Sequence, residues 1–167
     1  MKRNLVFFPI LFALVMLGCC VNIDGESLKN NPAYTKYIGC EYELTEELFL
    51  AKSFGNLYVV EPFPEDNVLR KFTNSPTLES FKNKTWNKEE YSGEYEYLEV
   101  IPKGAQLKLV DIVRMKNIEV GITYHVYANF INYTYKNQTE VNITWIVNDK
   151  EKPEKLRGAV LIKCENN

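Results

Sequence analysis

The sequence predicts a mainly β fold, a small antiparallel barrel or sandwich with one or two short helices, behind an N-terminal signal peptide. Two runs, residues 118–130 and 141–147, alternate apolar and polar side chains with the period of a half-buried strand. Turn-forming residues separate these and several shorter runs. A succession of strands joined by turns is typical of an antiparallel β domain.

The first 18 residues have the composition of a secretory signal peptide. Lys2 and Arg3 precede an uninterrupted apolar run over residues 5–17. This run is too short for a membrane-spanning helix, which needs about 20 residues. We therefore predict a signal over residues 1–18 and a mature chain from Cys19. The alternative is a stop-transfer anchor.

The end of this signal, Leu17-Gly18-Cys19, resembles the lipobox of bacterial lipoproteins, although Met16 departs from the preferred leucine. The resemblance implies that Cys19 is lipidated and holds the protein in a membrane of the cell envelope. The residue after it is Cys20 rather than aspartate, which implies the periplasmic face of the outer membrane in a Gram-negative source. In the alternative interpretation the signal is an ordinary one and both cysteines are incidental.

Beyond the signal the chain is mildly acidic and long enough for one domain. Without Lys2 and Arg3 it has 18 basic and 22 acidic residues, a net charge of −4. No basic block stands out, so nucleic acid is not an expected partner. Polar and small residues dominate residues 19–33, which we predict to be a flexible tether about 20 Å long. A single β-rich domain is expected over residues 34–167.

The first half of this domain contains short elements. Leucine and tyrosine on even positions predict a strand over residues 40–52, and a β-branched run predicts a short one over residues 57–60. Residues 65–92 have the fewest regular signals. We expect one helix there, beginning near Asp66 as its N-cap and ending near Phe72.

The second half has the stronger strand signals. In residues 118–130 the even positions are apolar, and we expect that face to point inward. The strands predicted in this half span residues 95–101, 106–114, 118–130, 141–147 and 156–164.

The turn between the first two of these strands carries a second resemblance. Residues 100–110 (VIPKGAQLKLV) resemble the Pro-x-Gly-hydrophobic hairpin of bacterial SH3-like domains. The resemblance implies an SH3-like barrel in which the two strands pair with each other. Binding of peptidoglycan or of a peptide follows from it by analogy alone.

The cysteines predict one disulfide. An exported chain meets oxidising conditions. Cys40 opens the first strand and Cys164 ends the last, so we predict that these two are bonded. Closing so long a loop stabilises the fold by about 4 to 5 kcal/mol. Cys20 is expected to be unpaired, and no close cysteine and histidine spacing suggests a metal site.

The sequence offers no pattern of residues typical of catalysis. His125, the only histidine, lies on the polar face of its strand, where a solvated ring is expected. No nucleophile motif accompanies it, although a hydrolase that uses His125 is an alternative. The carboxylate pairs Glu46-Glu47 and Glu89-Glu90 are interpreted as solvated charge. We expect no enzyme activity, no metal and no cofactor.

Tyrosines are the candidate ligand-binding residues. Tyr91, Tyr95 and Tyr97 interleave with glutamates, and a tyrosine offers a flat apolar ring with a polar tip that suits peptide or glycan contacts. Ordinary packing in a strand is the alternative explanation of the same pattern.

Three functions remain open. The first is a lipid-anchored envelope protein whose β-domain binds or scaffolds peptidoglycan or an envelope protein. The second is an inhibitor of an exogenous enzyme such as lysozyme, with a protruding loop within residues 65–92. The third is a secreted eukaryotic glycoprotein, which applies if Cys19 is not lipidated. The chain has four Asn-x-Ser/Thr sequons, at Asn83, Asn132, Asn137 and Asn142. In a secreted eukaryotic protein they are glycosylation sites, whereas in a bacterial lipoprotein they reflect only the many asparagines and threonines of the chain.

Overall fold

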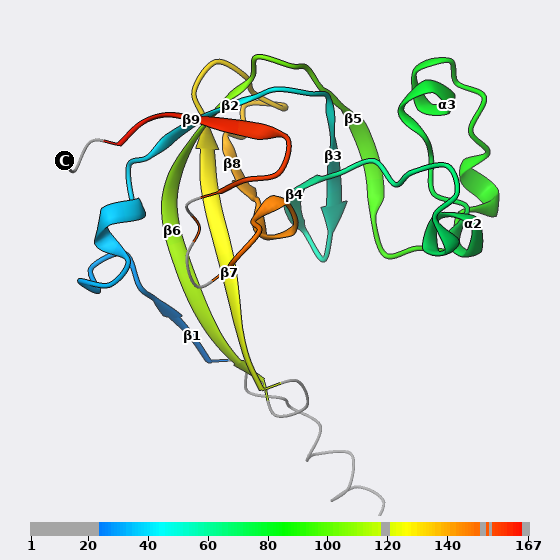
Figure 1. Ribbon diagram of the computed structural model, residues 1–167. Helices are drawn as coiled ribbons and strands as arrows, with labels where there is room; N and C mark the ends of the chain where they lie inside the picture. The colour runs from blue at the N-terminus through cyan, green and yellow to red at the C-terminus, as the bar shows by residue number, and fades with distance from the viewer. Residues whose placement is uncertain (1–23, 118–120, 151–152, 154, 165–167) are drawn as a thin grey trace, which may run out of the picture.

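The computed structural model describes residues 24–117, 121–150, 153 and 155–164 (Figure 1). This part of the chain is mainly β, which confirms the predicted class. Its strands are β1 Asp24–Ser27, β2 Glu41–Leu44, β3 Leu48–Ser53, β4 Asn56–Val60, β5 Glu96–Ile101, β6 Gln106–Asn117, β7 Gly121–Phe130, β8 Glu140–Asn142 and β9 Ala159–Lys163. The helical elements are short: η1 Thr35–Tyr37, α2 Val68–Thr73, α3 Leu78–Lys82, η2 Lys88–Glu90 and η3 Thr144–Ile146.

All nine strands belong to one curved sheet. Its order is β5-β3-β4-β8-β7-β6-β2-β9, and β1 is added alongside β6. Neighbouring strands are antiparallel except β4 and β8, which are parallel. The terminal strands β5 and β9 do not pair with each other, so the sheet is open and the expected barrel is not closed.

The hairpin suggested by the SH3-like resemblance does not form. The turn itself is present, with Gly104 at φ 85° and the Ala105 N–H donating to the Pro102 carbonyl over 3.2 Å. However, β5 pairs with β3, whereas β6 pairs with β7, β2 and β1. The two strands therefore diverge after the turn, because each finds its apolar partner elsewhere in the sheet.

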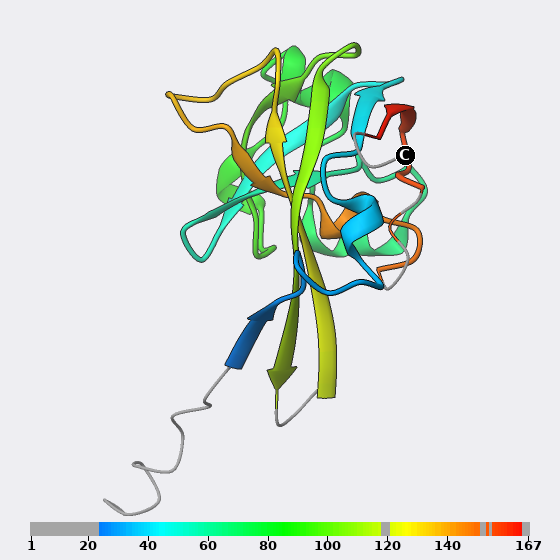
Figure 2. The same ribbon diagram turned by 90° about the vertical axis from the view of Figure 1, so that its left-hand side faces the viewer.

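Strands β6 and β7 form a long arm that projects from the body of the domain (Figure 2). The predicted even face of β7 points inward from Val126 to Phe130. Ile112 and Val126 are the last fully buried pair, and beyond them the hairpin continues to Asn117 opposite Gly121. Ile122, expected to be buried, is instead 58% exposed because it lies on this projecting part.

Strand β1 corrects the predicted tether. Asp24 to Ser27 pair with Lys116 to Val113 of the arm, and Leu28 is buried. Residues 24–28 are therefore part of the folded domain, since their backbone completes the sheet edge and Leu28 joins the core. The expected flexible segment over residues 19–33 does not extend across them, and residues 19–23 lie outside the described part of the chain.

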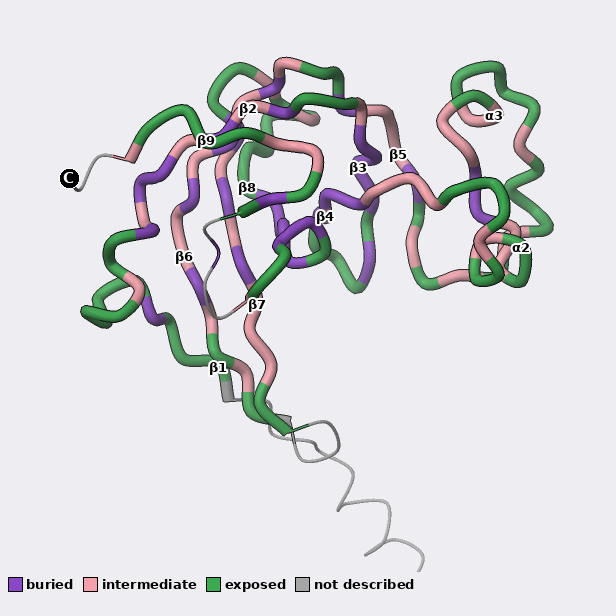
Figure 3. Tube along the Cα trace, in the orientation of Figure 1, coloured by how far each residue is buried: buried purple, intermediate pink, exposed green. Residues whose placement is uncertain are grey.

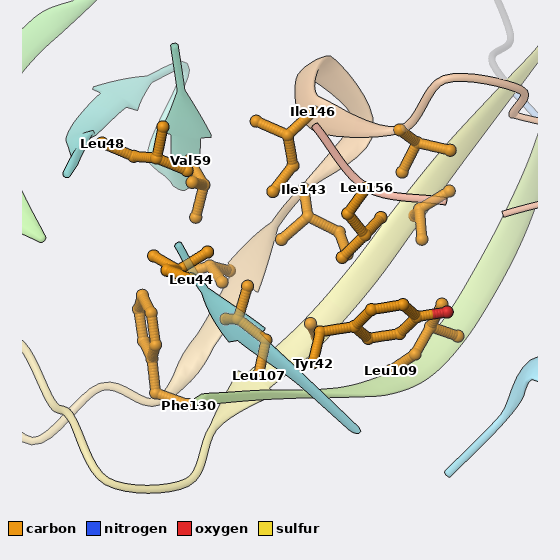
Figure 4. Close-up of a cluster of buried hydrophobic side chains, with 14 of the residues drawn as sticks. Tyr42, Leu44, Leu48, Val59, Leu107, Leu109, Phe130, Ile143, Ile146 and Leu156 are labelled. Atoms are coloured by element: carbon orange, nitrogen blue, oxygen red, sulfur yellow. The ribbon is translucent and has the colours of Figure 1, made fainter. Parts of the chain in front are cut away.

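The main core lies within the concave side of the curved sheet, where Figure 3 shows buried positions gathered along β2, β3, β6 and β7. The Tyr42 hydroxyl donates to the carbonyl of Pro153 over 3.0 Å, so its buried polar tip is satisfied. Figure 4 shows how side chains from β2, β3, β4, β6 and β7, from the segment at η3 and from the chain before β9 meet there: Tyr42, Leu44, Leu48, Val59, Leu107, Leu109, Phe130, Ile143, Ile146 and Leu156.

A second, aromatic cluster attaches residues 65–92 to the other face of β3 and β5. Phe49 and Tyr97 are its buried centre, with ring centroids 4.9 Å apart. Phe81, Trp86 and Tyr91 pack against them from the helical segment. Because rings packed edge to face are favourable, this segment is held to the sheet through its aromatic side chains.

The helices of this segment differ from the prediction in detail. Helix α2 begins one residue later than expected, since the N-cap is Asn67 rather than Asp66. The Asn67 side chain accepts hydrogen bonds from the N–H groups of Leu69 and Arg70, at 2.8 and 3.2 Å. Helix α3 was not predicted. Its start carries a capping box in which Thr77 and Ser80 satisfy each other's backbone N–H groups.

The predicted strand over residues 141–147 is only partly a strand. After β8 the chain turns into η3, which buries Thr144 and Ile146 and leaves Trp145 46% exposed. The Thr144 hydroxyl accepts the Val126 N–H over 2.9 Å, so a side chain replaces the backbone partner that a continued strand would supply. The predicted final strand over residues 156–164 is likewise shortened to β9.

The predicted disulfide between Cys40 and Cys164 is confirmed. It joins the residue before β2 to the residue after β9, and these two strands are antiparallel neighbours. An ion pair of 3.4 Å between Lys163 and Glu41 lies directly beside the bond. Cys20, expected to be unpaired, lies outside the described residues.

Candidate functional site

A cleft of about 680 Å³ lies where the chain leaves β4 and turns toward α2; we call it the main cleft. Its lining comes from separate segments of the chain, so only folding assembles it. The lining residues are Glu46, Val60, Glu61, Pro62, Phe63, Pro64, Asn67, Leu69, Glu94, Tyr95, Trp145 and Arg157.

One wall of the main cleft is built by the residues that end β4. Pro62 and Pro64 have no backbone N–H to extend the ladder and have a fixed φ, so the strand stops and the chain continues extended. Phe63 between them faces the cleft. The chain then reaches Asn67, which both caps α2 and lines the cleft, and α2 adds Leu69 at the rim.

The opposite wall is aromatic. Tyr95 lies just before β5, and its ring meets that of Tyr58 edge to face at 5.5 Å between centroids. Trp145 comes from η3, and the ammonium of Lys150 lies 4.9 Å from its ring centroid. Burial raises the pKa of Tyr95 to about 12, so its hydroxyl is protonated and neutral at physiological pH. The wall therefore offers flat apolar rings with a hydroxyl donor.

Arg157 is fixed at the cleft by the turn that precedes β9. The Arg157 N–H donates to the Ile146 carbonyl over 2.6 Å, and its guanidinium donates to the Trp145 carbonyl. The same guanidinium pairs with Glu61 at 2.8 Å. These contacts bind the aromatic wall to the end of β4.

The charge of the main cleft is negative, with three carboxylates against one guanidinium. Glu46 reaches the cleft across Gly158, where a Cβ would stand 2.5 Å from the Glu46 carboxylate. Burial raises the pKa of Glu61; the Arg157 guanidinium opposes this shift and the Glu46 carboxylate adds to it. Because the Glu46 carboxylate disfavours ionisation of Glu61, an additional cation in the cleft is favourable.

A smaller pocket of about 240 Å³, the side pocket, continues from the main cleft and shares Glu94, Tyr95 and Trp145 with it. Its far end is lined by His125 and Lys150. The two hollows adjoin at Tyr95 and Trp145, and we call them together the groove.

The structure corrects the expectation of a solvated His125, which is half-buried. Its Nδ1 lies 3.3 Å from the side-chain amide nitrogen of Asn142. Burial lowers the pKa of His125, and the nearby Lys150 ammonium lowers it further, so the neutral imidazole is favoured. The ring is held against β8 through Asn142, whose side-chain oxygen accepts the Thr144 N–H over 3.0 Å.

The three candidate tyrosines have different surroundings. Tyr97 is only 6% exposed and lies in the aromatic cluster, where burial raises its pKa, so it is a packing residue and the prediction for it is wrong. Tyr91 packs on Trp86 with 5.6 Å between ring centroids and is only partly exposed. Tyr95 alone of the three lines the groove. Strand alternation could not predict which tyrosine is buried, because Tyr91 and Tyr95 precede β5 and only Tyr97 lies in a strand.

The sequons are also unequal. Asn142 is 1% exposed, and its side chain is engaged with Thr144 and His125, so a glycan at this position is incompatible with the fold. Asn132 is exposed, but its side chain accepts the Gln106 N–H and donates to the Gly104 carbonyl. Asn83 and Asn137 are exposed.

The groove can bind and orient a ligand by stacking, hydrogen bonding and charge. In the described part of the chain no group of histidine, cysteine and acidic side chains is arranged to hold a metal ion. Glu61, Trp145 and Arg157 were not predicted as site residues. Of these three only Glu61 had a local signal, because it directly precedes the Pro62-Phe63-Pro64 pattern, in which an aromatic residue is held between two prolines.

Comparison with protein-family models, with curated proteins and with solved structures found no match to this chain. Among the described residues, no helix has both the length and the apolar character needed to cross a membrane. Cys19 precedes the described residues, so its lipidation stays a prediction.

Proposed function

We propose that this chain is a lipid-anchored protein of the bacterial cell envelope whose β-domain binds a cationic segment of an envelope protein. Cys19 is the proposed attachment point, from the Leu17-Gly18-Cys19 pattern at the end of an apolar run. The periplasmic face of the outer membrane is the proposed location in a Gram-negative source. The domain is proposed to act by binding and not by catalysis.

The observation that carries the binding role is the combination of aromatic walls and excess carboxylates in the main cleft. Tyr95 and Trp145 offer aromatic rings of the kind that attract a cation, and the Lys150 ammonium already lies over one face of the Trp145 ring. Glu46 and Glu94 add negative charge that the Arg157–Glu61 pair does not cancel. A lysine or arginine side chain matches both features, since its methylenes lie along apolar surface while its charged end meets the carboxylates.

The length of the groove supports a peptide rather than a single small ion. The main cleft and the side pocket meet at Tyr95 and Trp145. Leu69 of α2 lines the main cleft and is 61% exposed, and Val68 and Phe72 of the same helix are 78% and 82% exposed. An extended segment with a basic residue in the cleft could place an apolar neighbour against this helix. Peptidoglycan, the other proposed partner, fits the cleft less well, because binding its glycan strands gives no role to the excess carboxylates of the cleft.

The binding role is tested with short peptides that differ only in their central residue, lysine, glutamine or glutamate, with leucine on either side. We expect the lysine peptide to bind best in calorimetry. Glu94→Gln should weaken its binding about fivefold, as for a half-exposed ion pair of under about 1 kcal/mol. The matched control is Glu79→Gln, an exposed carboxylate on α3 outside the groove.

Trp145→Ala should weaken binding by a similar factor through loss of the ring face, about 1 kcal/mol at a partly exposed site. Equal affinity for the three peptides would contradict the proposal. The anchor is tested separately, by mass spectrometry of the mature N-terminal peptide. An unmodified Cys19 there would exclude lipid anchoring, whatever the groove binds.

A further inference from the structure

The chain enters the folded domain at the outer end of the β6–β7 arm. Asp24, the first described residue, pairs with Lys116, next to the last pair of the hairpin, Asn117 and Gly121. Figure 2 shows β1 and the projecting ends of β6 and β7 at the same end of the molecule, away from the body of the sheet. The opposite end of β6 leads back to the turn that contains Lys103.

The distance available between Cys19 and this point is short. Four residues lie between Cys19 and Asp24, which makes five steps along the chain. A fully extended chain spans at most about 3.5 Å per step, so the tether reaches no more than roughly 17 Å. Strand β6 alone has 12 residues, or about 40 Å at 3.3 Å per residue. A lipid on Cys19 therefore keeps the outer end of the arm within about 17 Å of the bilayer. The opposite end of β6, about 40 Å away along the strand, is not held there by the tether.

The side chains at this end of the arm suit the boundary between headgroups and acyl chains. Ile122 is 58% exposed and lies opposite Lys116, which is also exposed. Arg114, on the same strand, is paired with Glu26 of β1 at 2.5 Å. An exposed apolar side chain next to a basic one gives favourable contacts with both acyl chains and anionic headgroups.

We propose that the outer end of the β6–β7 arm, with Lys116 and Ile122, rests against the phospholipid headgroups of the membrane that holds Cys19. This inference depends on the lipid anchor proposed above. Tethering raises the effective concentration of the arm at the bilayer to the order of millimolar, so a weak contact is sufficient. The arm then acts as a spacer, because its five pairs beyond the buried core hold the domain about 17 Å farther from the surface.

The test uses the full lipidated chain in vesicles of phosphatidylethanolamine and phosphatidylglycerol. A membrane-impermeant lysine reagent labels the outside, and the labelling rate of each lysine is read by mass spectrometry. The reference is the same lipidated chain with a linker of about 20 glycine and serine residues inserted before Asn22, which adds roughly 25 Å of reach. Flotation of the vesicles reports whether each chain is anchored.

We expect Lys116 to be labelled more slowly in the natural chain than in the linker chain, and Lys103 equally in both. If the arm contacts the bilayer about 80% of the time, the difference at Lys116 is about fivefold. Ile122→Ser should remove most of this protection. The matched control is Phe54→Ser, which alters a 93% exposed apolar side chain on the β3–β4 turn and should leave the protection unchanged.

Equal labelling of Lys116 in both chains, with both chains floating, would overturn the inference and leave the anchor intact. Protection of Lys71 in place of Lys116 would also overturn it, because α2 would then be the membrane-facing surface. If the natural chain does not float, both the anchor and the arm contact are wrong. Peptide binding by the groove is unaffected by any of these outcomes, so the two proposals fail separately.

Discussion

Removal of the Cys40–Cys164 disulfide should cost this domain a large part of its stability. The bond closes a loop with a sequence separation of 124 residues. In the chain-entropy model a loop of that size stabilises the folded state by about 5 kcal/mol, by restricting the unfolded chain. Total stabilities of domains are about 5 to 15 kcal/mol. The double variant Cys40→Ala/Cys164→Ala is therefore expected to be folded but marginal.

The folded state itself should change little in this variant. Strands β2 and β9 remain paired along four positions from Glu41 to Leu44, and the Lys163–Glu41 ion pair does not depend on the sulfurs. Most of the effect should thus come from the unfolded state, which gains conformational freedom when the loop is open. The m-value should rise, because an uncrosslinked chain exposes more surface on unfolding.

Urea unfolding followed by circular dichroism measures the effect. With an m-value of about 2 kcal/mol/M, a loss of 5 kcal/mol lowers the midpoint by roughly 2.5 M. Cys20→Ser should be present in both proteins to prevent thiol exchange, and reduction of the parent should reproduce the double variant. A midpoint shift below about 0.5 M at constant m-value would refute the loop-closure reasoning.

Three further predictions follow from buried and capping groups. Tyr42→Phe should cost about 1 to 2 kcal/mol in the same urea assay, because the Pro153 carbonyl loses its buried donor; an unchanged midpoint would contradict this. Asn67→Ala should cost about 1 kcal/mol of helix stability, which hydrogen exchange of the α2 amides measures; unchanged exchange there would be evidence against the cap. His125 has a lowered pKa in the fold, so the unfolded chain takes up its proton first and stability should fall as pH drops below 6.5. His125→Asn should lose part of this fall between pH 7.5 and pH 5.5, and identical pH profiles would show that the histidine is not buried in solution.

The strands that periodicity predicted best are those in the middle of the sheet. In β7 the side chains of Val126, Ala128 and Phe130 are buried on one face, as alternation required. The same rule was wrong at Ile122, because the outer half of the hairpin has no layer packed over it. Alternation reports which side chains could share a face, whereas burial depends on whether another element covers that face.

Pairing between strands could not be derived from the pattern of the chain. The turn at Gly104 was visible, yet the strands on its two sides join different neighbours. Local turn chemistry fixes a change of direction but not the partner of each strand. The partner is chosen by apolar surfaces far apart in sequence, here Leu48 to Ser53 for β5 and Gly121 to Phe130 for β6.

The groove was predicted only in part. Tyr95 was proposed as a ligand-binding residue and lies between the main cleft and the side pocket. Tyr97 fits the same interleaved pattern and is interior. Trp145 and Arg157 had no local signal, because both depend on the 3₁₀ turn at η3 and on the backbone contact between Arg157 and Ile146.

By itself the sequence determined the mainly β class, most of the strands and the pairing of Cys40 with Cys164. Apolar alternation is a local property of the chain, and the two cysteines flank the first and last strands that it predicts. Only the tertiary structure decided that the sheet stays open, that residues 24–28 belong to it, and that an acidic aromatic groove forms beside α2. These features depend on contacts between distant segments. The free energy of each such contact depends on the apolar surface that two distant segments bury together, and neither segment alone specifies that surface.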